Sequence, residues 1–237
     1  MPTGSKILVI DVGGTHIKLL ITGMKTPIKI DSGPSFTAQD MVRDVKAALQ
    51  DRKYDAVSIG YPGPVVNGLP LREPYNLGGG WVGSNFRKAF GKPVKIINDA
   101  AMQALGSYEG GRMLFLGLGT GLGSAMIVDG VLQPMELAHL PYRHGKTYED
   151  YLGLRGLKRL GRKKWESRVL KVVTELRVAL VADYVVLGGG NAKKLKELPE
   201  QTSLGSNENA FKGGFRLWAP RMVSPKEPDS AIPRSAK

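Results

Sequence analysis

Short runs of apolar and β-branched residues recur along the chain, separated by turns rich in glycine, proline, asparagine and aspartate. Such runs between turn-forming residues are typical of β-strands. We therefore expect strands at Lys6–Ile10, Ile17–Thr22, Ile28–Ile30, Ala56–Gly60, Val94–Ile97, Met113–Leu118, Ser124–Val128 and Tyr184–Leu187. The first two runs flank Gly13 and Gly14, which predicts a β-hairpin with a glycine turn.

Other segments repeat apolar residues at helical spacing. In Thr37–Gln50 these residues include Met41 and Val45, and Thr37 is suited to cap the amino end. Further helices are expected at Asn85–Phe90, Ala100–Tyr108, Lys163–Ala182 and Asn207–Trp218. Strands, glycine turns and helices thus occur in two successive sets, which predicts an α/β fold of two lobes with a cleft between them.

This alternation also suggests where the lobes divide. We expect residues 1–110 together with 206–218 to form a smaller N-terminal lobe, and residues 111–205 a larger C-terminal lobe. Residues 219–237 combine proline, serine and balanced charges with few apolar side chains, which predicts a disordered tail. A chain of 237 residues, 42% of them hydrophobic, can bury cores of this size.

Composition excludes several classes of protein. The chain has no cysteine, which excludes disulfides, a thiolate nucleophile and a zinc–thiolate site. No apolar stretch approaches the ~20 residues that span a bilayer, and the amino end shows no signal-peptide pattern. We therefore expect a cytoplasmic protein with no membrane partner.

The net charge of +13 is unevenly distributed. Between Arg143 and Lys171, ten lysines and arginines stand against three carboxylates. Such a stretch attracts polyanions, although a solvated helix face would also account for it. A nucleic-acid partner is not favoured, because the sequence has no helix-turn-helix, RNP or zinc-finger pattern.

Two glycine-rich turns are candidates for binding phosphate groups, because glycine lets backbone N–H donors approach closely. The first joins Gly13, Gly14 and the hydroxyl of Thr15 to the carboxylate of Asp11, which can hold Mg²⁺ through water. Lys18 lies beyond the turn. A hairpin that simply needs glycines is the alternative interpretation.

The second candidate turn lies in Gly117–Gly123, where Gly119, Thr120 and Gly121 stand at the centre of four alternating glycines. It matches neither the P-loop nor the dinucleotide-binding fingerprint, because a strand follows it. Gly189 and Gly190 follow a further strand and can receive an adenosine or a phosphate-bearing group. A plain strand-to-helix turn would explain them equally well.

Transfer of a phosphoryl group to a hydroxyl requires a general base beside the attacking oxygen. Asp99 follows a strand and begins a helix, and Asn98 next to it can bind a neighbouring hydroxyl. Glu136 and His139 would share one face of a helix and can bind vicinal hydroxyls of a sugar. An Asn-Asp turn and a surface Glu-His pair are the structural alternatives.

Taken together, these motifs resemble the ROK family of sugar kinases, within the actin/hexokinase-like (ribonuclease H-like) superfamily. The resemblance covers about residues 6–218. It rests on Asp11–Lys18, Gly60–Gly63, Asn76 with Trp81, Asn98-Asp99, Gly117–Ser124, Glu136–His139 and Val185–Gly190. Within the family the chain is most similar to the polyphosphate glucokinases.

The resemblance implies a kinase that acts on the 6-hydroxyl of glucose or a related hexose, with Mg²⁺ and with polyphosphate or ATP as donor. It implies Asp99 as general base. The implied sugar ligands are Asn76, Asn98, Glu136, His139 and Glu149. It also implies a homodimer.

Two features depart from the family pattern. Many members hold zinc with cysteines and a histidine, whereas this chain has no cysteine and should bind no zinc. Ala138 stands where the family usually has glycine. Alternatives are a strictly ATP-dependent hexokinase, a sugar-binding protein without catalysis and a sugar-responsive nucleic-acid-binding regulator. The few residues before the first expected strand disfavour the regulator, because those relatives carry an N-terminal winged-helix domain.

Overall fold

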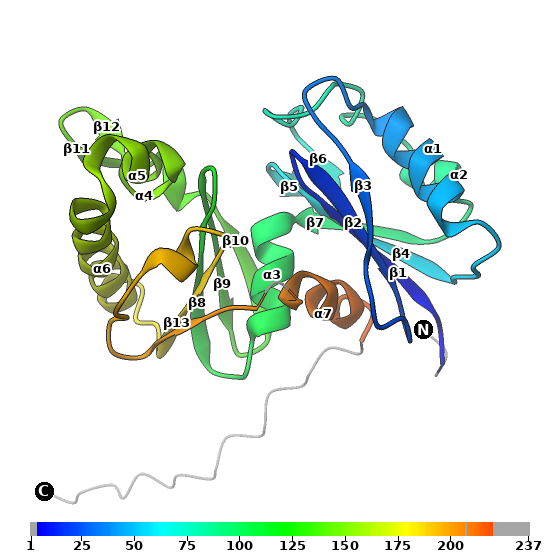
Figure 1. Ribbon diagram of the computed structural model, residues 1–237. Coiled ribbons are helices and arrows are strands. Elements are labelled where there is room, and N and C mark those ends of the chain that lie inside the picture. Colours follow the sequence, from blue (N-terminus) through cyan, green and yellow to red (C-terminus); the bar gives the residue numbers. More distant parts are fainter. Residues whose placement is uncertain (1–3, 207, 220–237) are drawn as a thin grey trace, which may run out of the picture.

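The computed structural model describes residues 4–206 and 208–219, and it contains two five-stranded sheets (Figure 1). The first sheet has the order β3-β2-β1-β4-β7. Its strands are β1 (Ile7–Val12), β2 (His16–Ile21), β3 (Ile28–Asp31), β4 (Ala56–Tyr61) and β7 (Val94–Asn98). β1, β4 and β7 run parallel, whereas β2 and β3 are antiparallel to their neighbours.

The second sheet repeats this arrangement with the order β10-β9-β8-β13-β14. Its strands are β8 (Arg112–Leu118), β9 (Leu122–Val128), β10 (Val131–Met135), β13 (Tyr184–Gly188) and β14 (Thr202–Leu204). Here β8, β13 and β14 run parallel, and β9 and β10 are antiparallel to their neighbours. Two small hairpins lie outside the sheets, β5 (Val65–Val66) with β6 (Leu69–Pro70) and β11 (Pro141–Arg143) with β12 (Lys146–Thr147).

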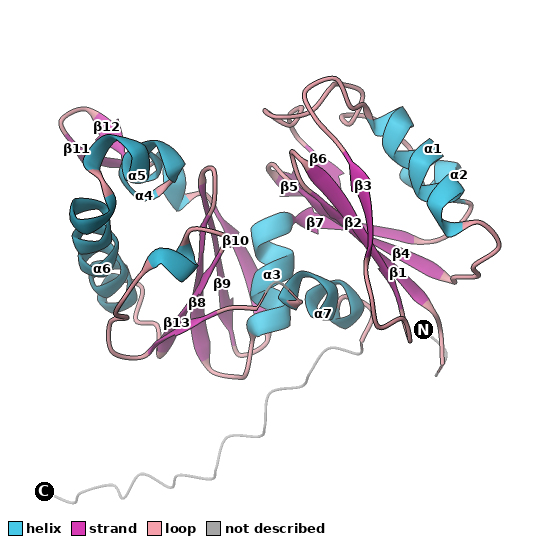
Figure 2. Cartoon of the chain, in the orientation of Figure 1, coloured by secondary structure: helices cyan, strands magenta, loops and turns pink. Residues whose placement is uncertain are grey.

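Helices cover both sheets (Figure 2). They are α1 (Ala38–Leu49), α2 (Phe86–Phe90), α3 (Asp99–Ser107), α4 (Tyr148–Leu152), α5 (Leu154–Leu160), α6 (Arg162–Ala179) and α7 (Asn209–Arg216), with 3-10 turns η1 (Leu137–His139) and η2 (Ala192–Lys194). α1 begins where Thr37 and Asp40 form a capping box, and it buries Met41 and Val45 against the first core. α6 buries Trp165 and its apolar face in the second core.

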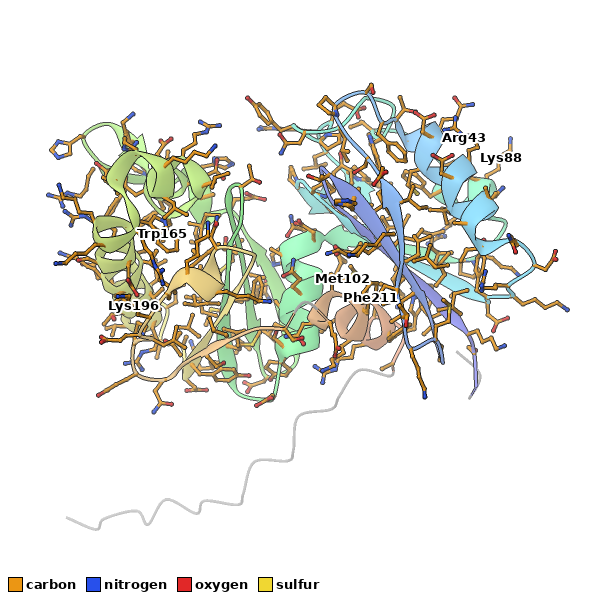
Figure 3. The ribbon with its side chains drawn as sticks, in the orientation of Figure 1. Arg43, Lys88, Met102, Trp165, Lys196 and Phe211 are labelled. Carbon is orange, nitrogen blue, oxygen red and sulfur yellow. The ribbon has the colours of Figure 1, made fainter. Side chains whose placement is uncertain are left out.

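α3 and α7 lie between the two sheets (Figure 1). They cross so closely that a Cβ on Gly106 would overlap the Asn209 carbonyl oxygen, and one on Gly213 would overlap that of Met102. Met102 and Phe211 pack together with residues of β1 at this crossing (Figure 3). The glycines therefore let α3, and with it Asp99, approach both sheets.

The expected strands and the glycine hairpin are confirmed. The α/β fold is confirmed as well, with two sheets of actin-like order. The helix expected at Ala100–Tyr108 begins one residue earlier, at Asp99. The last helix, expected at Asn207–Trp218, runs over Asn209–Arg216, and Asn207 lies outside the described residues. The short elements β5, β6, β11, β12, β14, α4, α5 and η2 were not expected, because their few residues carry no clear period.

The division into lobes at the stated boundaries stays a prediction. Those boundaries give the N-terminal lobe more residues than the C-terminal lobe, so the N-terminal lobe is the larger one and not the smaller one. In the expected tail, residues 220–237 lie outside the described residues. No helix within residues 4–206 and 208–219 is long and apolar enough to span a membrane.

Candidate active site

Asp99 is the first residue of α3 and directly follows β7. Asn98 caps this helix, since its Oδ1 accepts from the Ala101 N–H (3.1 Å). The Asn98 amide nitrogen also donates to the Gly63 carbonyl (3.1 Å). Asn98 thus holds the strand-to-helix junction and the loop after β4, and this places the Asp99 side chain at the carboxyl edge of the first sheet.

Two glycines leave room for this junction. A Cβ on Gly60 would overlap the end of Met102 and lie 3.6 Å from the Asp99 Cα. A Cβ on Gly123, in the second sheet, would lie 2.6 Å from the Cβ of Ala100. The first turn of α3 therefore contacts the first sheet at Gly60 and the second sheet at Gly123.

Two other carboxylates act on Asp99 at this edge. Burial, together with the smaller effects of the Asp11 and Glu136 carboxylates, raises the pKa of Asp99 to about 7. Asp11 is brought close because β1 pairs with β4 in a register that sets Asp11 beside Gly60. A carboxylate with a pKa near neutrality is suited to act as a general base.

Lys18 points toward Asp11, a direction that the sequence left open. The two residues face each other across the β1–β2 hairpin, and Lys18 Nζ lies 3.7 Å from Asp11 Oδ2. Burial raises the pKa of Asp11, while Lys18 opposes that rise. Asp11 fits Mg²⁺ bound through water, because a carboxylate is a usual ligand of this ion and Asp11 lies close enough to Asp99 for its charge to act on it.

The first glycine turn is held by the strand and loop beside it. Gly13 N–H donates to the His16 carbonyl (3.1 Å), and Ser32 Oγ donates to the Gly13 carbonyl (2.7 Å). A Cβ on Gly14 would lie 3.0 Å from the Cβ of Asn76. Thr15 is exposed at the tip. Asn76, predicted from the resemblance, therefore lies over this turn.

The second glycine turn is braced from two sides. The Asn191 amide nitrogen donates to the Gly119 carbonyl (2.8 Å), and the Leu154 N–H donates to the Thr120 carbonyl (3.1 Å). Gly119 N–H is engaged inside the turn with the carbonyls of Gly117 and Gly121. The Thr120 side of the turn is exposed. Asn191 was missed from the sequence, although its place directly after three glycines is a usable signal.

Gly189 has a structural reason to be glycine. Its φ is +81°, and a Cβ there would lie 2.5 Å from the carbonyl of Leu118. Gly190 is exposed, and a Cβ there would meet open space. The structure thus brings both residues beside the second glycine turn, and their contact with a donor stays a prediction.

Glu136 and His139 lie together, but the helix expected for them is wrong. The segment forms only the 3-10 turn η1, with His139 Nε2 3.7 Å from Glu136 Oε2. Leu137 N–H donates to the buried Ser124 Oγ (3.1 Å), which fixes the turn to β9. The methyl group of Ala138 packs into the second core instead of pointing into the site.

Glu149 and Trp81 have contacts that the sequence did not reveal. Glu149 Oε2 accepts from the Leu122 N–H (3.1 Å) beside Gly121, so this carboxylate braces the second turn. Trp81 is fully buried against Tyr61, and its Nε1 donates to the Gly78 carbonyl (2.8 Å). A sugar contact of Glu149 stays a prediction.

A groove of about 720 Å³ lies between α1 and α2, away from these residues. Arg43 is at its wall, on the outer side of the first lobe (Figure 3). Arg43 already binds Asp40 and Asp44. None of the candidate site residues lines this groove.

Fold and site together define an actin-like α/β protein with a glycine-rich turn in each sheet and a buried carboxylate, Asp99, at the start of the helix that contacts both sheets. The ROK family model matches residues 7–134, and the chain belongs to the ROK family. The polyphosphate glucokinase of Mycobacterium tuberculosis (strain ATCC 25177 / H37Ra) is 29% identical over 211 residues, 78% of this chain and 77% of that protein. The family resemblance is thereby confirmed.

Solved structures agree on the fold. An inorganic polyphosphate/ATP-glucomannokinase from Arthrobacter sp. strain KM superposes with a TM-score of 0.76 at 23% identity, covering 89% of this chain and 97% of that chain. A ROK family glucokinase from Streptomyces griseus, in complex with glucose and AMPPNP, gives a TM-score of 0.70 at 16% identity, covering 90% and 98%.

Proposed function

We propose that this protein is a glucokinase that transfers a phosphoryl group to the 6-hydroxyl of glucose, with Asp99 as general base. The observation that carries the proposal is the place of Asp99, at the start of α3, where the charges of Asp11 and Glu136 act on it and where the next residue, Ala100, meets Gly123 of the second sheet. The similarity to polyphosphate glucokinases supports the choice of acceptor.

In the proposed reaction, the ionised Asp99 accepts the proton of the 6-hydroxyl as its oxygen attacks the terminal phosphorus of the donor. The bond from that phosphorus to the bridging oxygen breaks, and the electron pair leaves with the shortened donor. A base with a pKa of about 7 is ionised in a large fraction of molecules at neutral pH. Asp99 is thus suited to this step.

The glycine turns would hold the donor. Gly14, Thr15, Thr120 and Gly121 offer backbone N–H groups and two hydroxyls at the edges of the two sheets. Mg²⁺ held through water by Asp11 would neutralise charge on the donor phosphates. Lys18, paired with Asp11, adds a fixed positive charge at the same edge.

The sugar would lie on the other side of Asp99. Glu136 and His139 are exposed and adjacent, so they can bind two neighbouring hydroxyls. Asn98 and Asn76 complete the proposed set of sugar-binding residues. Asn98 has one amide hydrogen beyond its bond to Gly63, and this hydrogen can be donated to a hydroxyl.

For the donor we propose inorganic polyphosphate, with ATP as the second candidate. α5 begins at the second glycine turn, through the Leu154 bond to Thr120, and leads into α6. Some basic residues of this stretch are held by neighbours, as Arg159 is by the Asp150 carbonyl. Lys158, Lys163 and Lys164 are exposed and make no ion pair within residues 4–206 and 208–219. Their charge favours a long polyanion.

The test is the formation of glucose 6-phosphate with Mg²⁺, measured in parallel with long-chain polyphosphate and with ATP. Faster turnover with polyphosphate is the expected result. Turnover with ATP alone would contradict the proposed donor and keep the proposed base. The absence of product with both donors, from glucose, mannose and glucosamine alike, would contradict the kinase proposal itself. The homodimer implied by the family is checked by light scattering on the purified protein.

A further inference from the structure

The segment between His139 and Glu149 forms a small hairpin outside both sheets (Figure 2). β11 and β12 pair only through Pro141 with Thr147 and Arg143 with Lys146. The hairpin is closed at its base by the Tyr148 N–H, which donates to the Leu140 carbonyl (3.1 Å). Hairpins this short are marginal on their own, so other contacts must hold it in place.

Three tyrosine rings supply those contacts, and we call them the tyrosine cluster. Tyr142, from β11, stacks on Tyr148 with ring centroids 4.9 Å apart and planes at 24°. The Tyr142 ring also meets Tyr151 edge-on, at 5.1 Å and 83°. Arg159 lies over the far ring, 4.7 Å from the Tyr151 centroid. Both stacked and edge-on pairs of rings are favourable geometries.

The tyrosine cluster joins the hairpin to the second core, because Tyr151 is only 8% exposed and all three rings pack there. On one side of the hairpin, His139 ends the turn η1. On the other side, Glu149 braces the second glycine turn through the Leu122 N–H. The capping box of Thr147 and Asp150 fixes α4 in its orientation. The cluster therefore lies between two residues of the candidate site.

We propose that Tyr142 is a positioning residue for acceptor binding: through the tyrosine cluster it holds the hairpin so that His139 keeps its place beside Glu136. This inference rests on the proposed function. His139 has an exposed side chain, and its one ion-pair contact in the described residues is Glu136 at 3.7 Å. The backbone around it must therefore set its position.

The experiment compares Tyr142→Ala with Tyr142→Phe in the full chain. Within the described residues the Tyr142 hydroxyl makes no hydrogen bond, so the phenylalanine ring should restore the stacking. Tyr142→Ala should raise KM for glucose about tenfold, a usual effect of losing substrate orientation, with KM for the donor unchanged. Tyr142→Phe should behave as the unmodified protein.

Tyr54→Ala is the matched control. It also removes a half-buried tyrosine ring, but from the first core. It should leave KM for glucose unchanged. If Tyr142→Ala raised KM for glucose and KM for the donor equally, or if Tyr54→Ala raised KM for glucose as much, the substitution would have loosened the fold in general. Either result would overturn the proposal.

Amide hydrogen exchange gives a readout that does not depend on activity. Tyr142→Ala should speed exchange in residues 136–147 while β8 and β13 keep their protection. Unchanged exchange in residues 136–147 would overturn the positioning role. If the unmodified protein phosphorylates no sugar, the proposed function fails, and the exchange result alone decides whether Tyr142 holds the His139 segment.

Discussion

The two five-stranded sheets have the same strand order and the same directions, yet their carboxyl edges are built differently. The first edge carries charged side chains, namely Asp11 and Lys18 on the hairpin and Asp99 after β7. At the second edge the turn is glycine and threonine, and it is braced by Asn191 and Glu149.

The difference shows how one arrangement can serve two purposes. A charged group acts best where it is partly buried, since the low local dielectric strengthens its field and shifts its pKa. A turn that cradles phosphate needs exposed backbone and a rigid shape. In the proposed reaction, the first edge would therefore supply the base and the charges, and the second edge a braced backbone surface.

Replacing the base should have the largest effect. Asp99→Asn should cut kcat by about 10²–10⁴-fold, because the 6-hydroxyl loses its proton acceptor. With the pKa of Asp99 at about 7, kcat/KM of the unmodified protein should rise with pH through that value and then level off. An Asp99→Asn protein with normal turnover would remove the functional distinction between the two edges.

Asp99→Asn should also change how the free energy of unfolding depends on pH. The pKa of Asp99 is raised in the folded protein, so the folded state binds more protons than the unfolded state between about pH 4 and pH 7. The contribution of Asp99 to stability therefore falls as pH rises through this window. Urea unfolding at several pH values should show a flatter dependence in Asp99→Asn than in the unmodified protein.

The joint between the sheets is the next place to test. Gly213→Ala should destabilise the fold by about 1–3 kcal/mol, because its methyl group would overlap the Met102 carbonyl where α3 and α7 cross. Gly33→Ala is the control, since a Cβ there meets nothing within 4 Å. Equal urea midpoints for the two variants would show that the close crossing is not needed.

Adding one methyl group to each of the two glycine turns compares the turns directly. In Gly13→Ala the new Cβ would lie 2.7 Å from the His16 carbonyl oxygen, which is backbone and cannot move aside. In Gly121→Ala it would meet the end of the Glu149 side chain, which can move at the cost of the Leu122 hydrogen bond. We expect losses of about 2 kcal/mol and about 1 kcal/mol, respectively, in thermal unfolding. The reverse order would contradict the bracing described for the second turn.

The smallest effect is expected from the basic surface beside the second edge. Neutralising Lys163 and Lys164 to glutamine should raise KM for long-chain polyphosphate about 2- to 10-fold at low salt and weaken its dependence on salt. KM for ATP should stay the same. The double variant of Lys25 and Lys53, two exposed lysines elsewhere, changes the net charge equally and should have no effect.

Much of the fold could be predicted because its signals are local. The hairpin around Gly13, the helix capped by Thr37 and the strand before Asp99 all follow from apolar runs and turn residues that are close in sequence. The turn η1 was mistaken for a helix, since three residues do not distinguish a 3-10 turn from an α-helix. The direction of Lys18 also required the register of β1 and β2.

By itself, the sequence determined the class of fold, the order of the motifs and the membership of the ROK family, because each depends on residue types and their spacing. Only the tertiary structure decided which residues meet. It placed Asp11 and Glu136 where their charges raise the pKa of Asp99, and it turned Glu149 to the Leu122 N–H. Those contacts join segments far apart in the chain, and their distances depend on how closely the two sheets and α3 pack.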